Sequence, residues 1–251
     1  MRHHSYTLAA AAAACLLLTS APAQAQRPIG EPAGAPAPTG QDATGFVARY
    51  GFDTATGNDD SGNGHTLRLV ARHRGTVRAI AHNTGRGIEF PARCSGGRCP
   101  HAVLQARSSA ALNPGFLPLA FGATVLLPPA QTSSGQNIVQ KGYSRTSSQY
   151  KLQVDGAAGR PSCVLVGVLE PRIRMARSRI SIADGRWHTL QCERRGGWLR
   201  IIVDGVVQGQ RRVPPLLTVV NWCPLSIGGK GAYADNDQFH GGIDDVWVRI
   251  G

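Results

Sequence analysis

Residues 184–205 carry the clearest alternation of apolar and polar positions in the chain. Residues 187–194 alternate, with His188, Leu190 and Cys192 on one face and Trp187, Thr189 and Gln191 on the other, and a period of two is typical of a β-strand. Gly196 and Gly197 can supply the positive φ angles of a short turn, and residues 199–203 alternate again before another turn pair. The pattern predicts two paired antiparallel strands and the start of a third. We expect the central hairpin of a larger sheet, because an isolated hairpin is marginal in water.

The rest of the chain from residue 45 onward shows a similar pattern, in which short apolar runs are separated by turn residues. The runs cover residues 46–52, 66–70, 87–90, 102–105, 116–127, 137–140, 149–154, 163–168, 172–175, 225–227 and 242–250. Strands at this spacing indicate an all-β sandwich or barrel. The longest run, residues 116–127, is long enough to bend from one sheet to the other. Residues 108–112 can form one helical turn.

The N-terminal residues have the layout of a secretory signal peptide, which we assign to residues 1–25. Arg2 is the positive start, residues 8–18 are an apolar run too short to span a bilayer, and small residues form a cleavage pattern at the end. Residues 26–44 are rich in Pro, Ala and Gly and predict a linker. We therefore expect a secreted, extracellular protein with one folded domain at residues 45–251 and no membrane span.

The formal net charge of the chain is +12, and the basic excess is almost entirely arginine. An exported basic protein can bind anionic cell-wall or cell-surface polymers, and the arginine-rich residues 172–179 are one candidate surface. The alternative is that an Arg- and Ala-rich, Lys-poor composition only reflects a GC-rich genome. No helix-turn-helix, zinc-finger or RNA-binding signature is present in the sequence, so we expect no nucleic-acid partner.

Five cysteines remain after the predicted signal peptide, and export favours disulfide formation. Cys94 and Cys99 enclose four residues and can close a small local loop. Cys163 and Cys192 each lie in a strand-like run and can bridge two strands. This leaves Cys223 either as a buried thiol or as a partner in an intermolecular bridge. The spacing does not decide among the possible pairings.

Four segments, in order, resemble the laminin G-like domain of the concanavalin A-like lectin/glucanase superfamily, in its bacterial secreted form. They are residues 50–52 with the Asp-Ser-Gly-Asn-Gly loop at 60–64, the Gly-x-Gly-apolar run at 85–90, the Asp-Gly-x-Trp-His…Val-Asp-Gly hairpin at 184–205, and the closing strand at 239–246. The resemblance implies a jelly-roll β-sandwich of two antiparallel sheets. It implies no single ligand, because lectins, hydrolases and adhesion modules share this fold.

The catalytic carboxylates of hydrolases with this fold are missing from the sequence. Those enzymes carry acids at alternate positions of one strand, where side chains share a face. No glutamate here has an acid two residues away, and Asp235 and Asp237, the acids at that spacing, lie in a loop-like segment. His188 is expected to be partly buried and to hold the hairpin through a backbone hydrogen bond. We therefore expect no catalytic residues, with a divergent polysaccharide hydrolase or lyase as a remaining alternative.

A structural calcium ion is the expected cofactor, if there is one. Asp59, Asp60 and Asn63 form an oxygen-rich loop, and Asp244 and Asp245 lie on the closing strand. The resemblance implies that the first and last strands are neighbours and that many members hold Ca²⁺ there. It therefore suggests Asp60 and Asp244 as ligands, with Asn63 and Asp245 as lesser candidates. The alternative is that these side chains only shape turns.

The candidate ligand-binding residues lie in the segment 230–238. Tyr233 offers a ring for stacking on a sugar, and Lys230, Asp235, Asn236 and Asp237 offer partners for hydroxyl groups. An ordinary solvated loop would have the same composition. We expect a non-catalytic binding module that recognises carbohydrate or a cell-surface component. The alternative is an extracellular structural or adhesion module without a small ligand.

Overall fold

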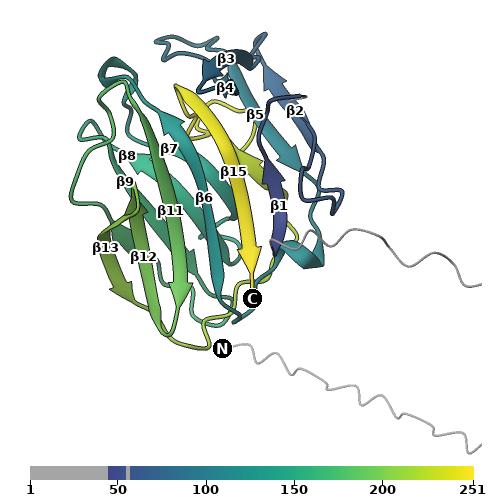
Figure 1. Cartoon of the computed structure of the whole chain (residues 1–251), viewed down its shortest axis with the longest axis vertical. Coiled ribbons are helices and arrows are strands. Elements are labelled where there is room, and N and C mark those ends of the chain that lie inside the picture. The colour runs from purple at the N-terminus through teal and green to yellow at the C-terminus, as the bar shows by residue number, and fades with distance from the viewer. Residues whose placement is uncertain (1–44, 55–56) are drawn as a thin grey trace, which may run out of the picture. The chain divides into compact units, whose positions relative to one another are not determined.

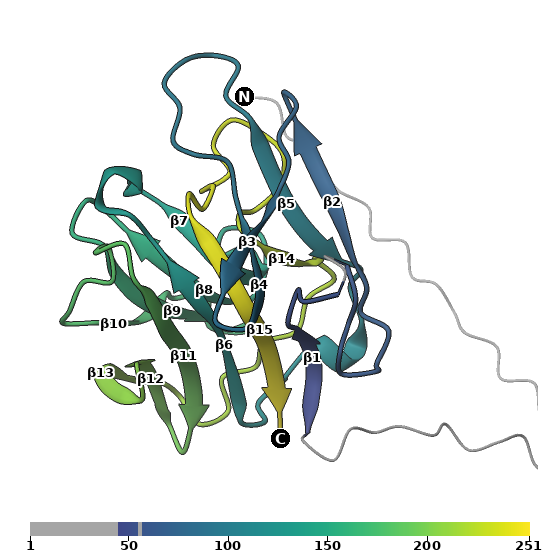
Figure 2. The same ribbon diagram turned by 45° about the horizontal axis from the view of Figure 1, so that its top comes forward.

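The structure, a computed structural model, describes residues 45–54 and 57–251. The predicted signal peptide, residues 1–25, and the predicted linker, residues 26–44, lie outside the described residues. The described chain forms two antiparallel sheets packed face to face (Figure 1, Figure 2). This confirms the predicted jelly-roll β-sandwich. No helix within the described residues is long and apolar enough to cross a membrane.

Sheet A has eight strands in the order β13-β12-β11-β6-β15-β4-β3, and β1 pairs with the C-terminal half of β15. Its strands are β1 (Phe46–Tyr50), β3 (Arg78–His82), β4 (Gly85–Glu89), β6 (Leu119–Leu126), β11 (Trp187–Arg195), β12 (Trp198–Val203), β13 (Val206–Arg212) and β15 (Gly242–Ile250). The predicted neighbourhood of the first and last strands is therefore confirmed.

Sheet B has seven strands in the order β10-β9-β8-β7-β14-β5-β2. Its strands are β2 (Leu67–Arg72), β5 (His101–Ala106), β7 (Gln136–Gly142), β8 (Gln149–Asp155), β9 (Arg160–Val166), β10 (Arg174–Arg177) and β14 (Leu225–Ile227). Two single-turn 3-10 helices, η1 (Ala110–Leu112) and η2 (Pro129–Gln131), lie between strands. The predicted helical turn at residues 108–112 corresponds to η1.

Two predictions about strand placement are wrong. The hairpin of residues 184–205 is not central, because β13 is an edge strand and β6 and β15 occupy the middle of sheet A. The run 116–127 does not bend into the other sheet, because β6 pairs along its length with β11 on one side and β15 on the other. The sequence pattern also missed β3, whose residues are mostly exposed and do not alternate.

His188 holds the hairpin through side chains and not through the backbone. Its Nδ1 lies 2.7 Å from Asp204 Oδ2, and its Nε2 lies 3.1 Å from Asp184 Oδ1. Partial burial disfavours the charged imidazole, but the hydrogen bonds to Asp204 and Asp184 outweigh it and raise the pKa of His188. The imidazole thus ties the turn before β11 to the turn after β12.

A single apolar core fills the space between the sheets. Leu190 and Cys192 of β11 point into it from sheet A, and Cys163 and Leu165 of β9 point into it from sheet B. A Cys163–Cys192 disulfide joins the two sheets, and a Cys94–Cys99 disulfide closes a surface loop. Both predicted pairings are confirmed, and Cys223 is a half-buried free thiol.

Two buried cations close one end of this core, one from each sheet. Arg194, at the end of β11, donates to the carbonyls of Leu217, at 2.6 Å, and of Leu117. Lys141 of β7 donates through Nζ to Asn221 O and Cys223 O, both at 2.9 Å. Neither cation forms a salt bridge within the described chain. Burial lowers the pKa of Lys141 to about 8.

The disulfide between the sheets should contribute most of the covalent stabilisation. Replacing Cys163 and Cys192 together by alanine removes a cross-link over a separation of 29 residues. We expect a loss of about 3–4 kcal/mol in the free energy of unfolding, because the unfolded chain gains conformational freedom. Urea unfolding measures it.

The matched control replaces Cys94 and Cys99 together by alanine. This removes a cross-link over a separation of only 5 residues. It should cost about 2 kcal/mol. Equal losses for the two pairs would contradict the assignment of the larger effect to the cross-sheet bridge.

Candidate functional site

The outer face of sheet B, which is turned away from the core, is polar along its length. The strand registers place Gln105, Ser226, Gln140 and Lys151 side by side in one row, with Gln153 in the next. Three of these side chains, Gln140, Gln153 and Ser226, are nevertheless buried. Buried amides and hydroxyls on the outside of a sheet require cover from loops and hydrogen-bond partners of their own.

The cover comes from the segment 228–241, which joins β14 to β15. Gln105 Nε2 donates to Lys230 O at 3.1 Å, and Tyr143 Oη donates to the same carbonyl at 3.2 Å. The segment therefore runs over the outer face of sheet B and forms one wall of a groove. A cavity of about 310 Å³ lies in this groove.

The floor of the groove is built mainly by β8. Its sequence Gln-Tyr-Lys-Leu-Gln-Val-Asp alternates strictly, so Tyr150, Leu152 and Val154 enter the core while the polar residues face outward. The lining contains Gln149, Lys151, Gln153 and Asp155 of β8, Val164 of β9, Met175 of β10, and Ser134, Gly135, Ser144, Ile173 and Asp237 from the surrounding segments.

The charges in the groove are partly shielded from water. Desolvation raises the pKa of Asp155 and lowers the pKa of Lys151, although the two groups attract each other. Gln153 Nε2 donates to the Asp155 carboxylate and to Ser162 Oγ. Lys230 Nζ and Asp237 Oδ2 form an ion pair of 2.6 Å at the rim. The groove thus presents both signs of charge beside amide donors and acceptors.

The segment 228–241 is held rigidly against β5. The Gln238 side chain bonds both backbone groups of Ala102. Its Nε2 donates to the Ala102 carbonyl at 2.9 Å, and its Oε1 accepts from the Ala102 amide at 2.9 Å. Asn236 Nδ2 donates to Gly231 O at 2.6 Å, and its Oδ1 lies 3.2 Å from His101 Nδ1. These bonds explain why Asn236 and Gln238 are almost completely buried in a segment rich in small polar residues.

The structure separates the five predicted ligand residues into three groups. Lys230 and Asp237 meet at the rim of the groove. Tyr233 is exposed, as is Asp235, which lines a second cavity of about 330 Å³ beside the Cys94–Cys99 loop. Asn236 uses its side chain inside the segment and therefore shapes it.

Sequence reasoning missed the groove residues of β8, Lys151, Gln153 and Asp155. The signal was present, because polar residues occupy every second position of residues 149–155. By itself this alternation predicts only a strand. The pattern alone does not tell whether the polar face of a strand is open to water or covered by a distant loop.

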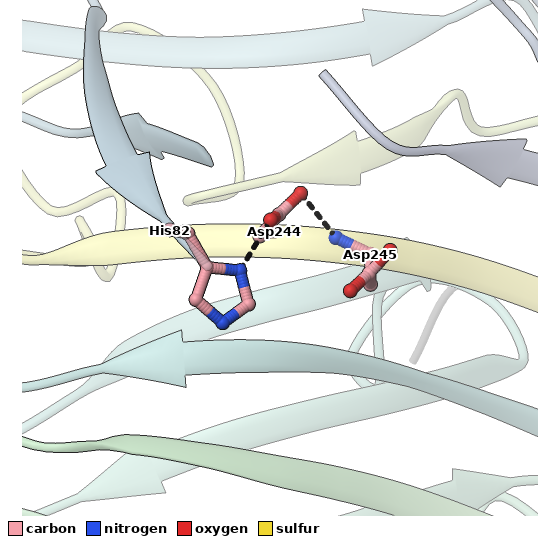
Figure 3. A group of neighbouring side chains, drawn as sticks. All are labelled: His82, Asp244 and Asp245. Atoms are coloured by element: carbon pink, nitrogen blue, oxygen red, sulfur yellow. Dashed lines mark hydrogen bonds and ion pairs between the residues drawn. The ribbon is translucent and has the colours of Figure 1, made fainter. Parts of the chain in front are cut away.

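An acidic cluster lies on the other sheet, where β15 bulges. Asp244 and Asp245 of β15 lie beside His82 of β3, and ligand atoms of the three residues are within 4.8 Å of one another (Figure 3). His82 Nδ1 is 2.5 Å from Asp244 Oδ2, and the Asp245 amide donates to Asp244 Oδ1 at 2.7 Å. Burial raises the pKa of Asp244 against the effect of both bonds. The Trp187 ring packs on His82, with ring centroids 4.2 Å apart.

Two of the four predicted calcium ligands, Asp244 and Asp245, are thus brought together. Of the other two, Asp60 lies just past the end of β1 and Asn63 lies at its start. Asp60 Oδ2 accepts from the Gly51 amide at 2.7 Å. Asn63 donates its side-chain amide to the carbonyls of Phe46 and Val47, each at 3.0 Å. Its role there is to hold the start of β1.

Asp53 connects the two groups of acids, and sequence reasoning did not select it. It lines a cavity of about 470 Å³ together with His82, Asp244 and Asp245. A Cβ on Gly51 would lie 3.3 Å from Asp60 Oδ2 and 3.9 Å from Asp53 Oδ2. Gly51 is thus close to Asp60. Asp53, whose Oδ1 also accepts from the Arg86 amide at 2.8 Å, lies between Asp60 and the cluster of His82, Asp244 and Asp245.

Comparison with known proteins gives one family and several structures of similar fold. A family model described as the concanavalin A-like lectin/glucanases superfamily matches residues 124–249. No curated protein matches the sequence. Domain 4 of AbnA, an extracellular arabinanase from Geobacillus stearothermophilus, in complex with arabinotriose, is 16% identical, with a TM-score of 0.61 over 82% of this chain and 92% of that chain.

Two toxin domains have a similar fold. The binding domain of Paraclostridial mosquitocidal protein 1 is 12% identical, with a TM-score of 0.64 over 82% of this chain and 48% of that chain. The binding domain of botulinum neurotoxin DC in complex with SialylT is 11% identical, with a TM-score of 0.58 over 82% and 48%. The chain spans about half the length of these toxin domains. At such low identity the likeness shows the fold.

The half-buried carboxylate of Asp155 in the groove should lower stability at neutral pH. Because its pKa is raised in the folded state, Asp155 favours folding when protonated and disfavours it when charged. Asp155→Asn should therefore raise the melting temperature at pH 7, and the gain should vanish at about pH 3, below the usual aspartate pKa.

Asp184→Asn is the control of opposite sign. A hydrogen bond from the Arg186 amide lowers the pKa of the exposed Asp184, so this replacement should lower the melting temperature at pH 7. Calorimetry at both pH values measures the two variants. A lower melting temperature for Asp155→Asn at pH 7 would show that the carboxylate stabilises the groove.

Proposed function

Because the chain belongs to the concanavalin A-like lectin/glucanase superfamily, we propose that it is a secreted, non-catalytic binding module that recognises carbohydrate. The groove on the outer face of sheet B carries this proposal. Secretion is supported by the signal-like residues 1–25 and by two disulfides, which are characteristic of exported proteins.

The chemistry of the groove suits a sugar chain. Sugar hydroxyls both donate and accept hydrogen bonds. The Ser134 and Ser144 hydroxyls in the lining can do both, while Gln149 and Gln153 offer side-chain carbonyl oxygens, because their amide nitrogens donate within the chain. Lys151 and Asp155 add charged partners in a partly desolvated setting, where hydrogen bonds are stronger. Tyr233, half-exposed in the covering segment, offers a ring face for stacking.

Structures with this fold supply a second line of support. The printed description of the arabinanase domain names arabinotriose, and that of the neurotoxin domain names SialylT. These ligands belong to those proteins. They make an oligosaccharide a reasonable first class of ligand to test here, including anionic cell-wall and cell-surface glycans, given the net charge of +12.

A catalytic role is the weaker candidate. Asp155 and Asp237 line the same cavity, and the Asp237 carboxylate contributes to raising the pKa of Asp155. Lys151 and Gln153 accompany Asp155, and Lys230 pairs with Asp237, which suits binding more than proton transfer. Product release from a polysaccharide panel, abolished by Asp155→Asn or Asp237→Asn, would favour a hydrolase or lyase.

A glycan array at physiological salt tests the proposal, followed by calorimetric titration of the best ligand. Lys151→Met should weaken binding at least ~10-fold, because Lys151 lines the groove, and Tyr233→Ala should also weaken it, because it removes the stacking ring of the covering segment. Phe116→Ala, an exposed aromatic outside the groove, is the matched control and should bind normally.

A blank array would favour the structural-module alternative. Binding that disappears steeply with salt and ignores both groove variants would assign it to arginine charge instead. Either result would remove the groove as a carbohydrate site.

We further propose that one calcium ion is held where the acids meet. Asp53, Asp60, Asp244 and Asp245 would supply carboxylate oxygens, the donor type that Ca²⁺ prefers. A divalent cation would offset the repulsion among these acids. His82 is not a typical calcium ligand, and its hydrogen bond with Asp244 would have to open or turn toward solvent. Asn63 would stay outside the set, because its amide is committed to β1.

Removal of calcium should lower the melting temperature, because an ion bound by the folded state alone stabilises it. The measurement is calorimetry of the exported protein with 1–2 mM CaCl₂ and, separately, with excess chelator. This calcium concentration is roughly 10² times an assumed Kd near 10 μM, so calcium should raise the free energy of unfolding by about 2.7 kcal/mol. Asp245→Asn should abolish the difference, and the exposed Asp235→Asn should keep it. An unchanged melting temperature with chelator would exclude the site.

A further inference from the structure

Large apolar side chains that point into solvent gather at one end of the sandwich, in the loops 114–118, 167–173 and 213–224. Trp222, Leu169 and Leu216 are 81%, 93% and 74% exposed. Phe116 and Leu117 are also exposed. We call this surface the apolar end. Exposed side chains of this size are common singly, but a contiguous group is typical of a binding surface.

The three loops form one continuous surface. Gly115 and Val219 exchange both backbone hydrogen bonds, at 3.0 and 2.9 Å. The Val168 amide donates to Thr218 O at 2.9 Å. The C-terminal Gly251 donates to Pro118 O at 3.0 Å, so the apolar end lies beside the C-terminus, at the lower end of the domain in Figure 1.

The two buried cations hold these loops in place. Arg194 binds the carbonyls of Leu117 and Leu217, which are next to the exposed Phe116 and Leu216. Lys141 binds the carbonyls of Asn221 and Cys223, on either side of Trp222. A buried cation without a carboxylate partner costs stability. Here the two cations keep the exposed apolar side chains in fixed positions. Less conformational entropy is therefore lost when these side chains bind a partner.

The charge around the apolar end is positive. Arg107, Arg145, Arg172 and Arg195 are exposed and flank the loops. The segments that build this end contain one acid, Glu170, and its carboxylate is paired with Arg174. A second copy of the chain is therefore a poor partner, because two arginine rims would face each other.

We propose that the apolar end is a docking surface for a membrane that contains anionic lipid. Tryptophan and leucine enter the boundary between headgroups and acyl chains, and tryptophan favours that depth. Arginines at the rim reach lipid phosphates while their aliphatic stems stay near the apolar side chains. Loop 167–173 also contributes Ile173 to the groove lining, so the two sites adjoin. Trp222, Leu169 and Leu216 lie outside that lining and can enter a membrane while the groove holds a glycan.

Vesicle co-sedimentation of the exported protein tests this inference, with pure phosphatidylcholine vesicles and with vesicles containing 30 mol % phosphatidylglycerol. We expect binding to the anionic vesicles and at least ~10-fold weaker binding to the neutral ones. The double variant Trp222→Ser, Leu216→Ser should lose binding ~10-fold or more. Arg145→Gln with Arg195→Gln should lose roughly 10- to 30-fold.

Matched controls come from the same chain. Leu69→Ser with Val206→Ser removes exposed apolar side chains elsewhere, and Arg186→Gln removes an arginine from the opposite end of β11. These variants should bind as the original protein does. All variants share the same residues before position 45, so any membrane affinity of that segment cancels. Thermal melts confirm that each variant is folded.

Quenching by lipids brominated on the acyl chains supplies a second readout, because it reports whether Trp222 enters the bilayer. The inference is overturned if neither vesicle binds, if binding ignores the Trp222 and Leu216 replacements, or if neutral vesicles bind equally well. Trp222 shielded from an aqueous quencher before vesicles are added would also overturn it, since another part of the chain or a second copy would then cover the surface.

Discussion

The sharing of one apolar core by two sheets is the constraint on which the rest of the structure depends. A sandwich covers its core on two faces and leaves the ends to loops, whose backbone polar groups need partners wherever they approach the core. In this domain buried side chains supply those partners. Arg194 and Lys141 bind loop carbonyls at one end, and Gln238 binds the backbone of Ala102 at the other. Both sets of loops are therefore ordered by the needs of the core.

This arrangement explains why surfaces with binding chemistry arise at specific places. The segment fixed by Gln238 covers sheet B and turns a polar sheet face into a groove, where Asp155 and Lys151 are partly desolvated. The loops fixed by Arg194 carry apolar side chains outward. In both cases a polar group is kept in an unfavourable environment and a surface gains rigidity. Such a combination is common where proteins trade stability for recognition.

Most of the fold could be predicted from the sequence because its strands alternate and its turns contain characteristic glycines. β14 and β15 agree residue for residue with the predicted runs 225–227 and 242–250. β3 was missed because it is an exposed edge strand without a period. The centre of sheet A was misplaced because strand order depends on pairings between distant segments, such as β15 with β6.

The candidate site was less predictable for the same reason. The composition of loop 230–238 indicates a binding segment. The groove could not be predicted, because it exists only where the fold places that loop beside the polar face of β8. Asp244 and Asp245 were selected from the closing strand, but His82 and Asp53 became their neighbours only through the pairing of β3, β4 and β15. The buried cations have no sequence signature, since an arginine or lysine at the end of a strand normally reaches solvent.

The central position of β15 also has a consequence for how the domain is made. This strand is synthesised after the other strands of the described domain, yet it pairs with β6 on one side and with β1 and β4 on the other. Until residues 242–250 are available, β6 and β4 present unpaired edges in the middle of sheet A, which are prone to aggregation. Sheet A can therefore close only after residues 242–250 have been synthesised, so its middle strands stay without a partner on one side while the rest of the domain is already available to fold.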